Sequence, residues 1–173
     1  SGKSILMVLL AKWLLEYDAN ARILIVTDRD ELDKQIEGVM KNSGVVGEES
    51  ASPRIVSRQD FNKKLSATMP RVLCALIHKF DLDLRSDPPP IHGSFYIFVD
   101  ECHRTQGGGM NKQMKRWLEN GIFIGFTGTP LLRKDRQTTR EVFGTYIHTY
   151  KFDEAVEDGV VLDLKYEARA VPQ

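Results

Sequence analysis

The sequence predicts an α/β domain of three layers, in which a mostly parallel sheet is flanked by helices on both sides. Short, continuously apolar runs alternate along the chain with segments whose apolar residues recur at helical spacing. The apolar runs lack the alternation of a sheet with one wet face, and such runs suit strands that are covered on both faces. A chain of 173 residues can bury one sizeable core, so we expect a single domain over residues 1–173.

The expected elements follow from these two periodicities. The expected helices cover residues 5–17, 28–40, 59–65 and 112–118. The expected strands cover residues 22–27, 55–56, 72–77, 95–99, 122–126 and 164–171. Residues 81–94 contain three consecutive prolines and are expected to form an irregular loop. In the first helix one wide apolar face is expected to be buried, formed by Leu6, Leu9, Leu10, Trp13, Leu14 and Tyr17.

Composition excludes some classes of protein and leaves others open. Lysine plus arginine equals aspartate plus glutamate at 24 each, so any nucleic-acid contact must come from a local patch. The sequence has no apolar run long enough for a membrane span and no signal peptide at its start. Cys74 and Cys102 lie far apart without a CxxC motif, which fits a reducing compartment. We therefore expect a cytoplasmic protein.

The first four residues, Ser1-Gly2-Lys3-Ser4, directly precede the first expected helix. They match the second half of the phosphate-binding loop G-x-x-x-x-G-K-[ST], whose first glycine and preceding strand would lie before Ser1. In such a loop, backbone amides and the helix N-terminus face phosphate oxygens, Lys3 reaches the β- and γ-phosphates, and Ser4 binds magnesium. The same four residues are also compatible with an ordinary helix cap and a solvated lysine.

Two carboxylates, Asp100 and Glu101, follow the apolar run at 95–99. Asp100 is suited to hold Mg²⁺, and Glu101 to polarise an attacking water. The alternative is a solvated acidic turn. Cys102 and His103 follow directly, but a zinc site or a Cys–His nucleophile has little support, because the other cysteine and histidines lack ligand spacing.

A third motif, Thr127-Gly128-Thr129-Pro130, follows the apolar run at 122–126. Ordinary turn chemistry explains this tetrapeptide by itself. The functional interpretation depends on the order of the three motifs, of which the second and third each follow an expected strand. In open parallel sheets, ligands bind beyond the carboxyl ends of the strands.

The series SGKS, DECH and FTGTP resembles motifs I, II and III of superfamily 2 helicases and translocases, with DECH as a variant of DEAH. That resemblance implies a RecA-like P-loop NTPase domain. Four longer stretches resemble the restriction subunit of type I restriction-modification enzymes: VTDRDELDKQ, DECHRTQGG, IFIGFTGTPL and residues 143–169. The chain departs from that family at Cys102, where alanine is usual, and at residues 75–80, where the family tends to have a threonine-rich segment.

The resemblance implies roles for particular residues. Gly2, Lys3 and Ser4 bind ATP, and Ser4 with Asp100 binds Mg²⁺. Glu101 activates water, and the implied catalytic residues are Lys3, Asp100, Glu101 and His103. The residues implied to couple nucleotide state to DNA contact are Thr27, Arg29, Thr127, Gly128 and Thr129; for Arg29, a helix cap by Asp28 is an equally simple explanation of the segment.

The resemblance also implies a larger machine. The chain is expected to be the first motor domain of a type I restriction endonuclease subunit in a prokaryotic cytoplasm, truncated inside the phosphate loop and again before a second motor domain. Its implied partners are duplex DNA, that second motor domain, and the modification and specificity subunits. The alternatives are a motor domain of another superfamily 2 DNA or RNA helicase and a degenerate nucleotide-binding interaction domain.

Overall fold

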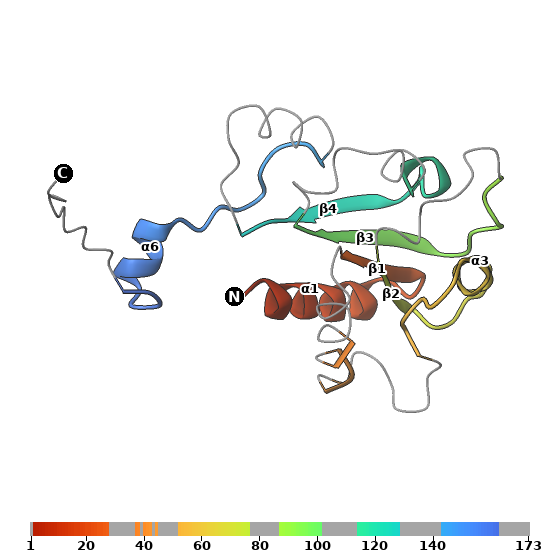
Figure 1. Cartoon of the computed structure of the whole chain (residues 1–173), viewed down its shortest axis with the longest axis horizontal. Coiled ribbons are helices and arrows are strands. Elements are labelled where there is room, and N and C mark those ends of the chain that lie inside the picture. The colour runs from red at the N-terminus through yellow and green to blue at the C-terminus, as the bar shows by residue number, and fades with distance from the viewer. Residues whose placement is uncertain are drawn as a thin grey trace, which may run out of the picture.

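Four parallel strands form the centre of the molecule in this computed structural model, which describes residues 2–27, 37–38, 40–42, 44, 52–76, 87–101, 114–128 and 143–162. The strands are β1 (Ala21–Thr27), β2 (Val72–Leu76), β3 (Ser94–Asp100) and β4 (Ile122–Phe126). They lie in the order β2-β1-β3-β4, and every pair is parallel (Figure 1). The expected parallel α/β class is therefore confirmed.

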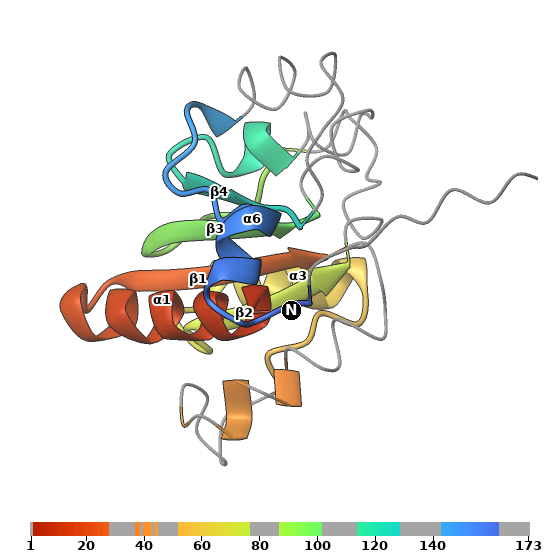
Figure 2. The same cartoon turned by 90° about the vertical axis from the view of Figure 1, so that its left-hand side faces the viewer.

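Helices cover both faces of this sheet, because alternate residues of a strand point to opposite sides. In β1, Leu24 and Val26 join one hydrophobic cluster, whereas Ile23 and Ile25 join the other. Helix α1 (Lys3–Tyr17) packs on the second cluster, and helix α3 (Arg58–Ser66) packs on the first (Figure 2). The result is the expected three-layer arrangement.

Helix α1 buries a different face from the one that the sequence predicts. Its buried residues are Met7, Val8, Ala11 and Leu14, at the spacing of one helical stripe. Of the six residues expected on the buried face, Leu14 is buried and Leu10 is half-buried, whereas Leu6, Leu9, Trp13 and Tyr17 are exposed. The prediction was wrong because the helix carries apolar residues around most of its circumference, so periodicity alone could not select the stripe that packs.

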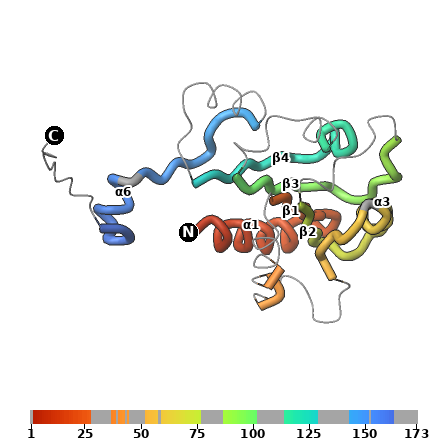
Figure 3. Tube along the Cα trace, viewed as in Figure 1, coloured from red at the N-terminus to blue at the C-terminus, as the bar shows by residue number. Residues whose placement is uncertain are grey.

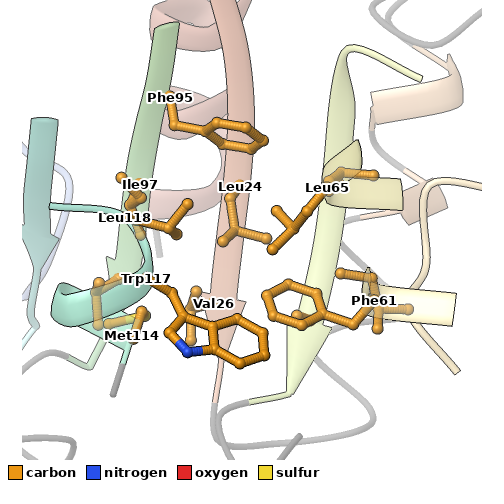
Figure 4. Packing of buried hydrophobic residues seen from close by; sticks show 13 residues of the cluster. Leu24, Val26, Phe61, Leu65, Phe95, Ile97, Met114, Trp117 and Leu118 are labelled. Atoms are coloured by element: carbon orange, nitrogen blue, oxygen red, sulfur yellow. The ribbon is translucent and has the colours of Figure 1, made fainter. Parts of the chain in front are cut away.

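The cluster beneath α3 joins residues that are distant in sequence. Phe61 of α3 stacks on Trp117, with ring centroids 6.1 Å apart and planes 6° from parallel (Figure 4). Helix α3 begins after Ser57, whose side-chain oxygen accepts a hydrogen bond from the backbone N–H of Asp60 at 3.1 Å. This N-cap satisfies one of the free amides of the first turn and helps to set where the helix starts.

Arg22 of β1 ties the C-terminal end of α3 to the sheet. Its guanidinium donates hydrogen bonds to four backbone carbonyls, those of Lys64, Leu65, Pro70 and His92. It also lies over the ring of Phe95, 4.6 Å from the centroid. Burial lowers the pKa of Arg22 to about 10, so the group stays charged at neutral pH. A charged side chain can occupy this buried position because the carbonyls replace its hydration.

Strand β4 is less covered than the sequence predicts. The run at 122–126 was expected to be covered on both faces, but Ile122 and Gly125 are exposed and only Phe126 is buried. Among the described residues β4 pairs with β3 alone and forms one edge of the sheet. An apolar sequence does not distinguish a central strand from such an edge strand.

The other expected elements have mixed outcomes. The expected strand at 55–56 is reduced to an isolated bridge between Arg54 and Cys74. Residues 114–117 are helical, within the helix expected at 112–118.

Helix α6 (Phe152–Glu157) was not predicted, and it lies beyond the end of the sheet at which α1 begins (Figure 3). Most of the helix expected at 28–40 and the whole strand expected at 164–171 lie outside the described residues. Within the described residues, no helix is both long and apolar enough to cross a membrane.

Candidate functional site

The carboxyl ends of the four strands lie at one edge of the sheet, because all the strands are parallel. Asp100 ends β3 and pairs in register with Phe126 of β4, which Thr127 and Gly128 follow. Thr27 ends β1 one position beyond Val26, which pairs with Val99. The parallel register therefore brings the first residues of the expected motifs II and III to the same edge.

Lys3 links the start of α1 to this edge. Its ammonium nitrogen, Nζ, lies 3.2 Å from Oδ1 of Asp100 and donates a hydrogen bond to Oε1 of Glu101. The residues that the sequence placed in motifs I and II, 97 and 98 positions apart, are thus in direct contact. Helix α1 has Gly2 as its N-cap, so no side chain of that residue occupies the helix N-terminus.

The two carboxylates reach the same lysine because the chain turns at Glu101. Successive residues of an extended strand point to opposite faces, which would separate the two side chains. Glu101 instead has a φ of 45°, in the left-handed region that residues other than glycine rarely adopt. No sequence signal predicts this turn, because glutamate is not among the residues that favour the left-handed region.

The interactions of Lys3 with Asp100 and Glu101 favour the protonated form of the lysine. Burial of Lys3 opposes its charge, but the hydrogen bond to Glu101 and the negative charges of Asp100 and Glu101 outweigh it, so the pKa of Lys3 is raised above its ordinary value. A raised pKa in the folded state means that the stabilising charge interaction is present at neutral pH. It is lost only as the pH rises through that raised pKa.

Gly128 lies near the lysine. A Cβ atom at Gly128 would lie 3.5 Å from Nζ of Lys3 and 3.9 Å from Oε1 of Glu101. The turn that follows β4 therefore lies close enough to the Lys3–Glu101 pair that a side chain at Gly128 would contact both residues. Thr127 is half-buried beside it.

The donor set fits a magnesium-bound nucleotide. Asp100 is 3% exposed and offers a carboxylate at the end of a buried strand, and Mg²⁺ typically takes one or two protein carboxylates together with phosphate oxygens. Lys3 offers a cation at a helix N-terminus, the position at which proteins bind phosphate. Among the described residues, no group of three or more histidine, cysteine, aspartate or glutamate side chains could hold a metal ion by itself.

Not every expected site residue falls in the described part of the chain. Lys3, Asp100, Glu101 and Gly128 lie together, whereas Ser4 is half-buried in the first turn of α1 and Thr27 is fully buried at the end of β1. His103, Thr129 and Arg29 lie outside the described residues. Their expected roles remain predictions.

Comparison with known proteins gives the family of this chain. Its sequence matches the SWI2/SNF2 ATPase family over residues 1–173. The chain belongs to the SWI2/SNF2 ATPase family. The SWI2/SNF2 match covers all three motifs, including the lysine and both carboxylates described above.

Curated relatives connect this SWI2/SNF2 domain to restriction enzymes. It is 36% identical over 176 residues to a Methanocaldococcus jannaschii protein assigned as the type I restriction enzyme MjaIXP endonuclease subunit, covering 99% of the chain and 16% of the relative. It is 32% identical over 186 residues to the type I restriction enzyme HindI endonuclease subunit of Haemophilus influenzae, covering 96% of the chain and 17% of the relative. The chain is thus homologous to these subunits and spans about a sixth of their length.

A solved structure supports the fold independently. The helicase domain of Pyrococcus furiosus Hef superposes with a TM-score of 0.59 at 18% sequence identity, over 83% of this chain and 31% of that one. At this identity the similarity concerns the fold alone. The SWI2/SNF2 domain therefore shares the parallel α/β fold of a helicase domain.

Proposed function

We propose that this chain is the first ATP-hydrolysing motor domain of a type I restriction endonuclease subunit, which moves duplex DNA before cleavage by a nuclease domain elsewhere in the protein. The observation that carries the proposal is the contact of Lys3 with both Asp100 and Glu101 in a chain of the SWI2/SNF2 ATPase family. The homology to type I restriction endonuclease subunits supports the restriction context.

In this proposal each residue of the cluster has a separate task. Gly2, Lys3 and Ser4 hold the phosphates at the N-terminus of α1, and Lys3 supplies positive charge where phosphoryl transfer develops negative charge. Asp100 and Ser4 hold Mg²⁺, which when bound neutralises charge on the phosphate oxygens. Glu101 orients and polarises the attacking water.

The same edge of the sheet provides a path from nucleotide to DNA. Gly128 lies near the Lys3–Glu101 pair, since a Cβ added there would contact both residues, and we propose that a change in that pair alters the turn after β4. We propose that Thr127, Gly128 and Thr129, with His103, transmit the nucleotide state, and that Thr27 and Arg29 contact the DNA backbone. A second motor domain of the same chain and the modification and specificity subunits would complete the assembly.

A test of this function is ATP hydrolysis by the full-length parent protein with duplex DNA, with RNA and with no nucleic acid. We expect duplex DNA to stimulate hydrolysis and Glu101→Gln to abolish it, whereas Glu119→Gln, at an exposed turn of the same domain, leaves it intact. Stimulation by RNA alone would instead favour an RNA helicase. The absence of hydrolysis under all conditions would favour an interaction domain.

The isolated chain is expected to hydrolyse ATP far more slowly than its parent. In the proposed motor, charge on the transferring phosphoryl group is also stabilised by arginines of the second motor domain, and an arginine supplied in this way is worth about 10³ to 10⁵ in rate. Comparison of the turnover of residues 1–173 with that of the parent measures what the rest of the parent protein contributes. Equal turnover would contradict a shared active site.

A further inference from the structure

We propose that Glu101 competes with the phosphates of a nucleotide for Lys3, and that this competition restrains nucleotide affinity when no divalent cation is present. The inference rests on the proposed function, since it concerns the same site. It goes beyond that function because it gives Glu101 a role in binding that is separate from its role in activating water.

Lys3 is already engaged by both carboxylates. Its ammonium lies 3.2 Å from Asp100 and is hydrogen-bonded to Glu101, and a Cβ added at Gly128 would be in van der Waals contact with it. An ammonium group has three donors, and carboxylates already engage it twice. One donor is left for a phosphate, so a phosphate that takes two donors of Lys3 must displace one of these carboxylates, and the cost of doing so is subtracted from the affinity.

The two carboxylates differ in how easily a nucleotide can displace them from Lys3. The Asp100 side chain is 4% exposed and is anchored at the end of β3 between two neighbouring strands. The Glu101 side chain is 22% exposed and sits on a left-handed turn at the end of the strand. Glutamate also has one more rotatable bond than aspartate. The Lys3–Glu101 pair is therefore the one that a nucleotide displaces.

A divalent cation relieves this competition. A cation held by Asp100 adds positive charge beside both carboxylates and weakens their attraction for Lys3. Lys3 then becomes available to phosphate at a lower cost. Cation and nucleotide binding are thereby linked, and linkage of binding free energies is reciprocal, so each ligand raises the affinity of the other by the same factor.

The test is the equilibrium binding of ADP to the full-length parent protein by titration calorimetry, once with EDTA and once with Mg²⁺. In EDTA, Glu101→Gln should bind ADP about threefold to tenfold more tightly than wild type, the range expected for loss of a partly exposed charged hydrogen bond. The factor by which Mg²⁺ strengthens ADP binding should shrink accordingly. The control Glu119→Gln, which removes an exposed carboxylate of the same domain, should leave both values unchanged.

A second variant keeps the negative charge but moves it. Glu101→Asp withdraws the carboxylate from Lys3 by one methylene, so it should also tighten ADP binding in EDTA, which a general loss of structure would not do. Unchanged or weaker binding in both variants overturns the competition. If wild-type parent protein binds no ADP even with Mg²⁺, the proposed nucleotide site itself is wrong, and the two failures are thus distinguishable.

Discussion

Asp100 and Glu101 are neighbours in sequence, but their surroundings differ. Asp100 belongs to a buried strand whose neighbours on both sides fix its position, whereas Glu101 lies on the turn that leaves the sheet. A metal ligand needs a fixed position, and a group that polarises water needs room beside the reacting atoms. The difference in surroundings is what allows two identical functional groups to have separate roles in the proposed mechanism.

Replacing Gly128 with side chains of increasing size tests how closely the turn after β4 surrounds the site. A Cβ there would make only ordinary contacts with Lys3 and Glu101, so Gly128→Ala should retain binding of Mg-ADP within about threefold. Gly128→Val adds two methyl groups in the direction of the ion pair and should weaken binding by about tenfold or more. Binding by titration calorimetry measures both variants of the parent protein. Equal binding by the valine variant would mean that the turn does not confine Lys3.

The sequence alone predicted which residues form this cluster, but not how they meet. Parallel strands end at one edge, so the strand ends that carry Asp100 and Gly128 could be placed together before the structure. The direct pairing of Lys3 with Glu101 could not, because it depends on a left-handed φ that the sequence does not signal. The exposed fraction of each carboxylate likewise depends on packing that periodicity does not encode.

For helix α1 as well, the sequence predicts one feature of the structure and not another. Its existence and extent follow from an apolar sequence without helix breakers over Lys3–Tyr17. Its orientation does not, because nearly every side of the helix carries a large apolar residue. The stripe that packs on the sheet is selected by tertiary fit, with Ala11 at its centre, fully buried, where a small residue permits close approach to the strands.

Two leucines of this helix test the observed orientation. Leu14 is buried in the cluster against the sheet, whereas Leu9 is 60% exposed. Leu14→Ala should lower the free energy of unfolding by about 2–3 kcal/mol, and Leu9→Ala by about 0.5 kcal/mol or less. Urea unfolding of the chain followed by circular dichroism compares the two. A larger loss for Leu9→Ala would restore the face that the sequence predicted.

Arg22 links the C-terminal end of α3 to the sheet through hydrogen bonds. Arg22→Met keeps much of the volume but leaves four buried or half-buried carbonyls without their donor, so it should lower the free energy of unfolding by about 2 kcal/mol. Arg116→Met is the matched control, because Arg116 is exposed and should change stability by about 0.5 kcal/mol or less. Similar effects of the two substitutions in urea unfolding would show that the carbonyl contacts contribute little.

The chain spans about a sixth of the length of the curated restriction subunits that it matches. The parallel sheet and its two helical layers position one cluster of charged residues at one edge. In the proposed function, residues of this cluster bind the nucleotide. In the proposed motor, the DNA that is moved and the energy that hydrolysis delivers involve surfaces elsewhere in the parent protein, so the activity belongs to the assembly.

Calorimetric binding of Mg-ADP to the parent protein tests whether Lys3 and the two carboxylates form a nucleotide site. We expect wild type and Lys12→Ala, which removes an exposed lysine of the same helix, to bind alike. Lys3→Ala should lose detectable binding, because it removes the cation at the helix N-terminus. Binding of Mg-ADP by Lys3→Ala with wild-type affinity would show that Lys3 is not part of a nucleotide site.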